Sequence, residues 1–329
     1  MTEAATARLP EPALHVEQAL NDLGAQGISI QSGFLDEDRR RILLERVLEQ
    51  AELERAQGVA ELSGTGTASE RQFAGGGAPP APFQAITFLP NKGRPFVDLF
   101  MDERLQAYCR QAFGDVPYYL TSQTATIVRE GAAAQVIHSD QQAWPFTTPA
   151  PALLTFVICL TDFTPDMGST RFVPATQSLP PPEIGYREDI GRVGNLADLE
   201  PIPFTASAGA LVCWDGRTWH GQGPSTSPRD RIGIIMTFAM HMVRAQDNYA
   251  ALLHDHIYET LSDAERAMLG FEVHFEYAGR VAPRTPSDRR FNTNSRYPYV
   301  PELRRGSSAV AVPISDARID HPSAQAARH

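Results

Sequence analysis

The sequence predicts a mainly β protein with flanking helices, in which the strands form a double-sheet sandwich or jelly roll. Apolar residues recur at helical spacing near both ends, whereas the stretch from Pro117 to Met242 has the pattern of strands. This stretch holds six segments rich in β-branched and aromatic residues, joined by long, irregular connections that are typical of jelly rolls. No internal repeat is present. The six expected strands are 118–129, 134–140, 153–162, 171–174, 210–214 and 232–240.

The N-terminal part of the chain is predicted to be largely helical. Helices are expected over 14–23 and 96–113, with a long helix between them that begins at Asp36 and a short strand at 28–30. Asp36 is a good N-cap, and the acidic residues that follow it favour the start of a helix. Residues 63–82 are rich in glycine, serine and proline and predict a mobile surface loop, with a lid over a bound substrate as the alternative.

The C-terminal part is predicted to return to helices and then to lose regular structure. Helices are expected over 249–259 and 262–269, and the second begins at Ser262 with a capping box. We interpret 1–304 as one domain and 305–329 as a disordered tail. The expected parts of the domain are N-terminal helices at 14–113, a β core at about 117–242, and a helical and irregular C-terminal cover at 245–304.

Composition and charge narrow the class of function. The chain has 329 residues, a net charge of −10 and a pI near 5.4, and it contains no basic run. This balance argues against nucleic acid or an anionic membrane as the partner. The N-terminus lacks the pattern of a secretory signal, the apolar runs are too short to span a bilayer, and three widely spaced cysteines predict free thiols. We expect a cytoplasmic protein, monomeric or homodimeric, whose partner is a small molecule.

The triplet His138-Ser139-Asp140 is the first candidate for metal binding. On an extended strand, residues two apart lie on the same face, so the imidazole of His138 and the carboxylate of Asp140 can reach one cavity. A second imidazole would complete the two-histidine, one-carboxylate set of non-haem Fe(II). His220 is the best candidate among nine histidines, because a small-residue turn, a buried strand and a second turn place it at a strand edge. Taken alone, His138 and Asp140 would more often be ordinary half-buried or turn residues.

Arg231 follows His220 by eleven residues, at the start of the apolar segment 232–240. An unpaired buried charge is costly, and a carboxylate fits the planar guanidinium through two hydrogen bonds. Asp230 could instead supply a surface salt bridge, and Arg229 is a rival for the carboxylate-binding role. The His-Asp-His triplet at 254–256 falls in an expected helix, where positions two apart do not face each other, so we expect solvated side chains there.

Three motifs together resemble the phytanoyl-CoA dioxygenase family. They are H-S-D-Q at 138–141, D-M-G-S-T-R at 166–171 and W-D-G-R-T-W-H-G-Q-G-P-S-T-S-P-R-D-R at 214–231. The motif His-x-Asp alone is a weak signal, but a histidine 82 residues later and an arginine eleven residues beyond it are specific. The resemblance covers roughly 20–245 and is tight over 135–240. It implies a double-stranded β-helix core and a dioxygenase that uses Fe(II), 2-oxoglutarate and O2.

The resemblance also implies the residues of the site. Thr170 matches a position whose hydroxyl assists cosubstrate binding, and Gln135 matches one that contacts the cosubstrate. Strict alternation from His138 would turn Gln135 to the opposite face, so a bulge or twist is needed there. The expected metal ligands are His138, Asp140 and His220, and Arg231 is expected to bind the distal carboxylate of 2-oxoglutarate.

Two departures from the family pattern affect the neighbouring loops. Many members have asparagine shortly after His-Gly-x-Gly, where this chain has Pro224 and Ser225, which leaves the shape of that loop open. Residues 141–145 do not match the aromatic and acidic residues of the ectoine hydroxylases, so ectoine is not the expected substrate. Substrate contacts are instead expected from Trp144, which is favoured over the other two tryptophans, from Gln142 and from Arg217. For Arg217, a structural pairing with Asp215 is an equal alternative.

The resemblance implies hydroxylation of a small molecule with release of succinate and CO2. The expected substrate is a natural-product intermediate or an amino-acid-like compound. A carboxylate ligand favours hydroxylation over halogenation, because halogenases of this fold lack that carboxylate. The alternatives are desaturation or cyclisation by an enzyme of the same family, or a non-catalytic, cupin-like small-molecule binding protein.

Overall fold

The part of the chain that the structure describes forms two antiparallel sheets. The structure is a computed structural model, and it describes residues 8–64, 72–73, 81–141, 148–182 and 200–272. The strands are β1 (Ile28–Gln31), β2 (Glu61–Ser63), β3 (Gln72–Phe73), β4 (Phe83–Ile86), β5 (Tyr118–Val128), β6 (Leu153–Cys159), β7 (Thr170–Val173), β8 (Ile202–Pro203), β9 (Leu211–Asp215), β10 (Trp219–Gln222) and β11 (Arg231–Met240). The larger sheet has the order β1-β9-β6-β11-β5-β4-β2-β3, and the smaller sheet has the order β10-β7-β8.

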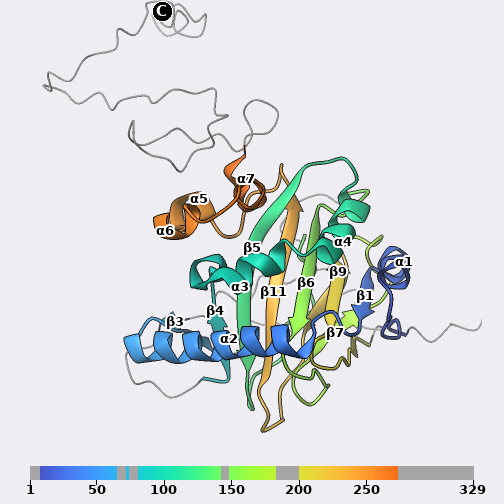
Figure 1. Cartoon of the computed structure of the whole chain (residues 1–329). Coiled ribbons are helices and arrows are strands. Elements are labelled where there is room, and N and C mark those ends of the chain that lie inside the picture. The colour runs from blue at the N-terminus through green and yellow to red at the C-terminus, as the bar shows by residue number, and fades with distance from the viewer. Residues whose placement is uncertain (1–7, 65–71, 74–80, 142–147, 183–199, 273–329) are drawn as a thin grey trace, which may run out of the picture. The chain divides into compact units, whose positions relative to one another are not determined.

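Helices precede and follow the strands of the core. They are α1 (Val16–Gln26), α2 (Glu37–Gln57), η2 (Leu89–Lys92), α3 (Arg94–Phe100), α4 (Glu103–Phe113), α5 (Tyr249–Leu252), α6 (Asp255–Tyr258), α7 (Asp263–Arg266) and η3 (Ala267–Phe271). Figure 1 shows α2, α3 and α4 lying across one face of the larger sheet. The described residues belong to one compact unit, Met1–Arg280, and a second unit, Val281–His329, lies outside them.

The larger sheet is buried on both faces. Its outer face packs in one apolar cluster with the helices, and this cluster includes Leu43 and Val47 of α2 and Phe156 and Phe238 of the sheet. Its inner face packs in a second apolar cluster with Phe172 and other residues that lie towards the smaller sheet. Burial on both sides explains why β6 is apolar along its whole length apart from one threonine. The predicted mainly β class with flanking helices is confirmed.

Five of the six predicted strands are present within a few residues of their expected bounds, as β5, β6, β7, β9 and β11. The prediction of a continuous strand at 134–140 was wrong. Residues 134–137 have no regular secondary structure, and the segment pairs with β10 through a single bridge between His138 and His220. The segment passes close to β10 because Gly221 has no side chain there: a Cβ on Gly221 would lie 2.9 Å from the Val136 carbonyl oxygen.

The helix predictions were correct in type and partly wrong in extent. The expected helix at 96–113 is two helices, because Asp102 caps the second one by accepting a hydrogen bond from the Arg104 backbone amide. The expected helix at 249–259 is likewise divided into α5 and α6. The N-cap at Asp36 and the capping box at Ser262 are confirmed. Most of the expected loop 63–82, together with 281–304 and the tail 305–329, lies outside the described residues.

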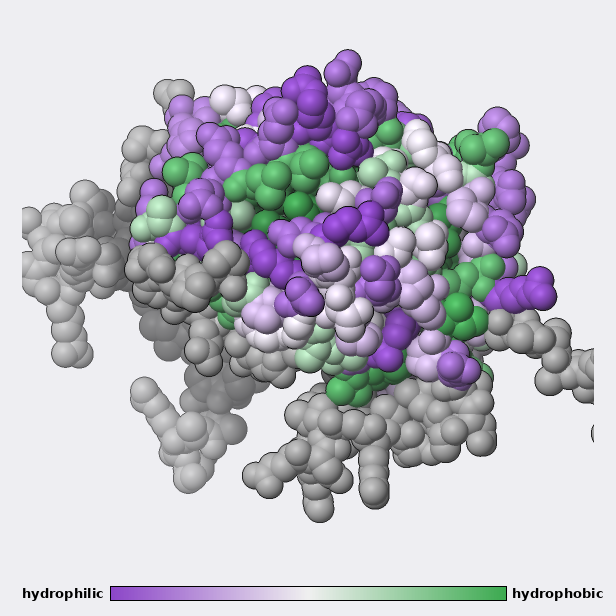
Figure 2. Space-filling view, turned by 90° about the horizontal axis from the view of Figure 1, so that it is seen from below, coloured by the Kyte–Doolittle hydropathy of each residue, from purple (hydrophilic) through white to green (hydrophobic). Residues whose placement is uncertain are grey.

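Polar side chains cover much of one face of the described part of the molecule. Figure 2 shows hydrophilic residues spread over one face of the molecule, with hydrophobic residues in smaller groups between them. Cys109, Cys159 and Cys213 are buried free thiols, as predicted. None of the helices in the described part of the chain combines the length and the apolar composition that a bilayer crossing requires.

Candidate metal centre

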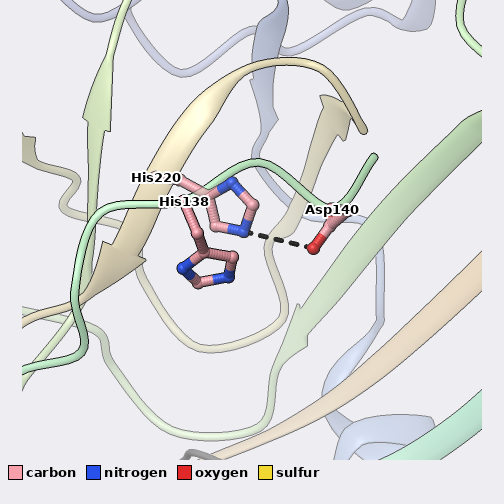
Figure 3. Close-up of side chains that lie close together, drawn as sticks. All are labelled: His138, Asp140 and His220. Atoms are coloured by element: carbon pink, nitrogen blue, oxygen red, sulfur yellow. Dashed lines mark ion pairs between the residues drawn. The ribbon is translucent and has the colours of Figure 1, made fainter. Parts of the chain in front are cut away.

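Two histidines are brought together by neighbouring backbone segments at the edge of the smaller sheet. His138 and His220 exchange backbone hydrogen bonds of 2.8 Å in both directions, so their side chains project side by side. Their ring centroids are 4.5 Å apart. Figure 3 shows both imidazoles beside Asp140, which follows His138 by two residues. One nitrogen of each histidine and one oxygen of Asp140 all lie within 4.8 Å of one another, close enough to hold one metal ion.

The backbone fixes the orientation of both imidazoles. The Nδ1 atom of His138 lies 2.9 Å from the Val136 carbonyl oxygen, and Nδ1 of His220 lies 2.9 Å from the Thr218 carbonyl oxygen. A carbonyl oxygen only accepts hydrogen bonds, so Nδ1 carries a proton in each ring and Nε2 is the nitrogen left for a metal ion. Nε2 of His220 faces Oδ1 of Asp140 at 3.5 Å. Burial lowers the pKa of His138, with a further contribution from His220, and this favours the neutral form that binds metals.

The carboxylate of Asp140 is held through its other oxygen. Oδ2 accepts hydrogen bonds from the Thr155 hydroxyl at 2.8 Å and from Nε1 of Trp214 at 3.0 Å. Oδ1 is therefore directed towards the histidines. Burial alone would raise the pKa of Asp140, but the two histidines and the Thr155 hydrogen bond outweigh burial and lower it, so the group is an anion at neutral pH.

The Thr155 hydrogen bond gives a test of this orientation. We expect Thr155→Val to weaken binding of Fe(II) by about 10–100-fold, because a metal ligand loses affinity when its supporting hydrogen bond is removed. Competition between the protein and a coloured chelator measures the affinity. Thr237→Val is the matched control, since Thr237 is the cross-strand neighbour of Thr155 and makes no described contact with Asp140. An equal loss in both variants would contradict the expectation.

Arg231 lies at the start of β11 and is buried, and no described residue supplies it with a countercharge. Its Nη2 donates a hydrogen bond of 3.0 Å to the side-chain oxygen of Gln222, and its Nε has no hydrogen-bond partner among the described residues. Its guanidinium carbon lies 4.8 Å from the centre of the Phe163 ring. Burial lowers the pKa of Arg231 to about 10. The guanidinium is therefore desolvated and is paired only with a neutral amide, which leaves it ready for an anion.

The metal-binding group and Arg231 line one cavity of about 440 Å³. Gln135 also lines it, and the side-chain oxygen of Gln135 accepts a hydrogen bond of 3.0 Å from the Gln222 backbone amide. The irregular backbone before His138 lets Gln135 face this cavity, where a regular strand would not. Thr170 lies in the same cavity, because it is the cross-strand partner of Gln222. Six of the predicted site residues thus share one cavity: His138, Asp140, His220, Arg231, Thr170 and Gln135.

The predicted substrate residues do not all join this group. Arg217 forms an ion pair of 2.7 Å with Asp215 and donates to the Thr148 carbonyl oxygen, and it lines a different cavity. Gln142 and Trp144 lie outside the described residues. The other candidates considered from sequence, which are Arg229 and the triplet at 254–256, are exposed to solvent.

Among the residues that line the cavity, sequence reasoning missed Gln222, Thr155 and Asp247 and ranked Trp214 low. Gln222 lies two residues after His220 on a strand, so alternation could have identified it. Trp214 was ranked below Trp144, although its indole contacts Asp140. No sequence signal identified Thr155 or Asp247, because their proximity to the site depends on strand pairing and on the path of a loop.

The fold and the site define a jelly-roll protein with a His–Asp–His group at the opening between its sheets. A sequence model of the family described as phytanoyl-CoA dioxygenase (PhyH) matches residues 42–233, which is more than half of the chain. The chain belongs to this family.

Curated relatives of this chain are fungal dioxygenases. The chain is 28% identical to dioxygenase af480 of Aspergillus fumigatus over 214 residues, which cover 62% of this chain and 65% of the relative. It is 27% identical to dioxygenase FrzG of a Cladobotryum species over 184 residues, which cover 53% and 59%. The chain thus spans less than two thirds of the length of each of these relatives.

Similar solved structures confirm the jelly-roll fold. The epimerase SnoN, solved with Fe3+, alpha ketoglutarate and nogalamycin RO, matches with a TM-score of 0.53 and 18% identity over 69% of this chain and 84% of SnoN. The alpha-ketoglutarate-dependent carbocyclase SnoK matches with a TM-score of 0.51 and 19% identity, over 70% of this chain and 88% of SnoK. At these identities the likeness establishes the fold, and the function has to be argued from the site.

Proposed function

We propose that this protein is a non-haem Fe(II)- and 2-oxoglutarate-dependent dioxygenase that hydroxylates a small molecule. In this reaction a substrate C–H group, O2 and 2-oxoglutarate give an alcohol, succinate and CO2. The observation that carries the proposal is the convergence of His138, Asp140 and His220 in one cavity with Arg231, a guanidinium whose Nε has no partner among the described residues.

The donor set fits Fe(II). Two neutral imidazoles and one carboxylate form the set that non-haem Fe(II) oxygenases use, and such a set leaves coordination positions for other ligands. Each of the three side chains has a hydrogen bond that directs its ligand atom: the two histidines to backbone carbonyls and Asp140 from Thr155 and Trp214. Supporting contacts of this kind are typical of metal ligands.

The other end of the cavity fits the distal carboxylate of 2-oxoglutarate. Arg231 is a buried cation whose described hydrogen-bond partner is a neutral amide, so a carboxylate would supply the missing charge. The hydroxyl of Thr170 and the side chain of Gln135 face the same space and can add hydrogen bonds. Without the cosubstrate, Arg231 donates a hydrogen bond to the side-chain oxygen of Gln222. A carboxylate oxygen of 2-oxoglutarate would accept this hydrogen bond instead.

When bound, the metal and 2-oxoglutarate supply the oxidising chemistry, and the chain supplies binding, orientation and exclusion of water. Arg231 and Thr170 would fix the far end of the keto acid, which directs its other end towards the histidines. Phe163 and Val157 also line the cavity and make part of its wall apolar. Thr155 and Trp214 would keep Asp140 in position during turnover.

Desaturation or cyclisation is the second candidate reaction, and two observations support it as an alternative to hydroxylation. Similar structures include an epimerase and a carbocyclase, both of which depend on alpha ketoglutarate. The residues that hold the metal and the cosubstrate are the same whichever reaction follows, so the outcome depends on how the substrate is placed. Product mass separates the candidates, because hydroxylation adds one oxygen atom and desaturation removes two hydrogen atoms.

Anaerobic titration with Fe(II) and 2-oxoglutarate tests the proposal. We expect a weak visible charge-transfer band that saturates at one equivalent of each and is absent without either. Screening of candidate small molecules for succinate release coupled to a product of increased mass then tests hydroxylation. A folded protein that gives no band would contradict the proposal and favour a metal-free binding protein.

A further inference from the structure

The wall of the cavity opposite the histidines is lined with hydroxyl groups. Ser122, Thr124 and Thr126 alternate along β5, so their side chains point to the same face and into the cavity. Thr237 of β11 faces the same space beside them, because Ser122 is its cross-strand partner. A wall of this composition is polar, although it belongs to the central strands of a sheet that is apolar elsewhere.

Three of these hydroxyls have unused hydrogen-bonding capacity. Thr124, Thr126 and Thr237 are 9%, 4% and 5% exposed, and their hydroxyls make no hydrogen bond to another described residue. A hydroxyl that faces a cavity and has no protein partner can both donate a hydrogen bond to a ligand and accept one from it. The wall is therefore suited to a ligand that carries several polar groups.

A row of residues crosses the sheet from this wall to the metal-binding group. Ser122 pairs with Thr237, and Thr237 pairs with Thr155, whose hydroxyl donates to Asp140 at 2.8 Å. At the far end of the row, the Ser122 hydroxyl lies near Asp247 and lowers the pKa of that carboxyl. Neighbouring strands are about 4.8 Å apart, so Ser122 and Thr155 are separated by about 10 Å. A carboxylate thus lies at each end of the row.

Asp247 is a half-buried carboxylate that lines the cavity without a cationic partner among the described residues. Its Oδ2 accepts hydrogen bonds from the Tyr249 hydroxyl at 3.2 Å and from the Gln123 backbone amide at 3.4 Å. Burial raises the pKa of Asp247, and the nearby carboxylate of Glu61 adds to the increase. A cation next to Asp247 would oppose both effects and favour the carboxylate.

In the cavity loaded with Fe(II) and 2-oxoglutarate, Asp247 is the charged side chain that no opposite charge neutralises. This count of charges rests on the proposed function. The charges of Fe(II) and of 2-oxoglutarate cancel, and the charge of Arg231 cancels that of Asp140. With both histidines neutral, Asp247 is the remaining charged residue among those described in the lining. A ligand with a positive charge would neutralise it, whereas an anionic ligand would be repelled.

We propose that the site takes a cationic, polar substrate whose ammonium group binds Asp247 and whose other polar groups bind the threonine wall. The reacting carbon then lies one to two strand spacings from the ammonium group, at about 5–10 Å. The substrate class is an amine that also carries hydroxyl or similar groups, in preference to a neutral hydrocarbon or a carboxylic acid.

The test uses three probes that share one ring and differ in charge: 4-aminocyclohexanol, cyclohexane-1,4-diol and 4-hydroxycyclohexanecarboxylate. Their dissociation constants are measured by ligand-observed NMR on the full chain loaded with Fe(II) and 2-oxoglutarate without oxygen. We expect the amine to bind about tenfold more tightly than the diol, as is usual for a hydrogen bond to a charged group, and the acid to bind most weakly. Equal binding of amine and diol, or no detectable binding of the amine, would overturn the proposal.

Variants of Asp247 then test whether the preference for the amine over the diol depends on this carboxylate. We expect Asp247→Asn to remove the difference between amine and diol, and Asp247→Glu to retain part of it. Asp263→Asn is the matched control, because it removes a carboxylate whose side chain is 95% exposed on α7. A preference for the amine that persists in Asp247→Asn would assign it elsewhere and contradict the inference.

The charge-transfer band separates this proposal from the proposed function. A band with no preference for the amine leaves the dioxygenase assignment intact and overturns the substrate class. A preference for the amine that depends on Asp247, in a protein that gives no band, supports the binding site and contradicts the oxygenase. The band in Asp247→Asn also shows whether that variant is folded around its metal.

Discussion

Asp140→Ala is expected to abolish binding of Fe(II) and to lower succinate release by well over about a hundredfold. Loss of a ligand should exceed the 10–100-fold cost of losing a residue that only supports a ligand. The two histidines remain, but they leave the metal without the anionic donor, and Trp214 and Thr155 lose the group to which they donate. Metal content after dialysis and succinate release with 2-oxoglutarate measure the two effects.

Asp38→Ala is the matched control for this experiment, because Asp38 is an exposed carboxylate on the surface of α2. It should leave metal content and turnover unchanged. Far-UV circular dichroism and thermal unfolding distinguish loss of the metal from loss of the fold. If the folded Asp140→Ala protein retains its metal and full turnover, Asp140 is not a ligand.

Arg231→Gln is expected to weaken binding of 2-oxoglutarate by about 100-fold. Removing one member of a buried, hydrogen-bonded charge pair costs roughly 2–5 kcal/mol, and about 1.4 kcal/mol corresponds to a factor of ten. The affinity is measured by titrating the charge-transfer band with 2-oxoglutarate at fixed Fe(II). Arg229→Gln is the control that the chain itself offers, since Arg229 is two residues away and exposed. Equal losses in both variants would remove Arg231 from this role.

Replacement of Arg231 by an apolar residue is expected to weaken cosubstrate binding but to stabilise the cosubstrate-free protein. Without 2-oxoglutarate, Arg231 is a buried cation whose Nε has no partner among the described residues. We therefore expect Arg231→Met to raise the free energy of unfolding of the cosubstrate-free protein by about 1–3 kcal/mol, while it abolishes cosubstrate binding. A marked destabilisation would indicate that the guanidinium supports the fold through contacts other than the one with Gln222.

The long strands of the core could be predicted from sequence, and the short ones could not. β5 and β11 have ten or more residues with β-branched and aromatic side chains, which gives a clear pattern. β2, β3 and β8 have two or three residues each, so no periodicity can develop in them. They exist because a neighbouring strand supplies hydrogen bonds, and that information lies far away in the sequence.

The errors at 96–113 and 134–140 have different causes. In the first segment, Asp102 was available as a signal, because aspartate inside a helical pattern favours an N-cap. In the second segment, the residue pattern is typical of a strand, but a ladder also needs a partner in register. β10 offers only four residues, and the segment approaches it closely enough for one bridge.

The candidate ligands could be found from sequence because the spacing within His-x-Asp is a local signal and the spacing between the motifs is a family-wide signal. Their surroundings could not be found in this way. Trp214 reaches Asp140 because β9 pairs with β6 so that Trp214 lies beside Thr155. Asp247 faces the cavity because the chain turns back after β11, and its backbone amide donates to the Thr121 carbonyl oxygen. Both depend on the register of pairing, which composition does not specify.

The single bridge between His138 and His220 has a consequence for how this protein is held together. An ion bound by both histidines and Asp140 would act as a cross-link between parts of the chain that are 82 residues apart, at a sheet edge with few backbone hydrogen bonds. Occupancy would then contribute to conformational stability, by about 2.7 kcal/mol at a free metal concentration one hundred times the dissociation constant. The supply of iron would thereby affect how long the folded protein persists as well as its rate of catalysis.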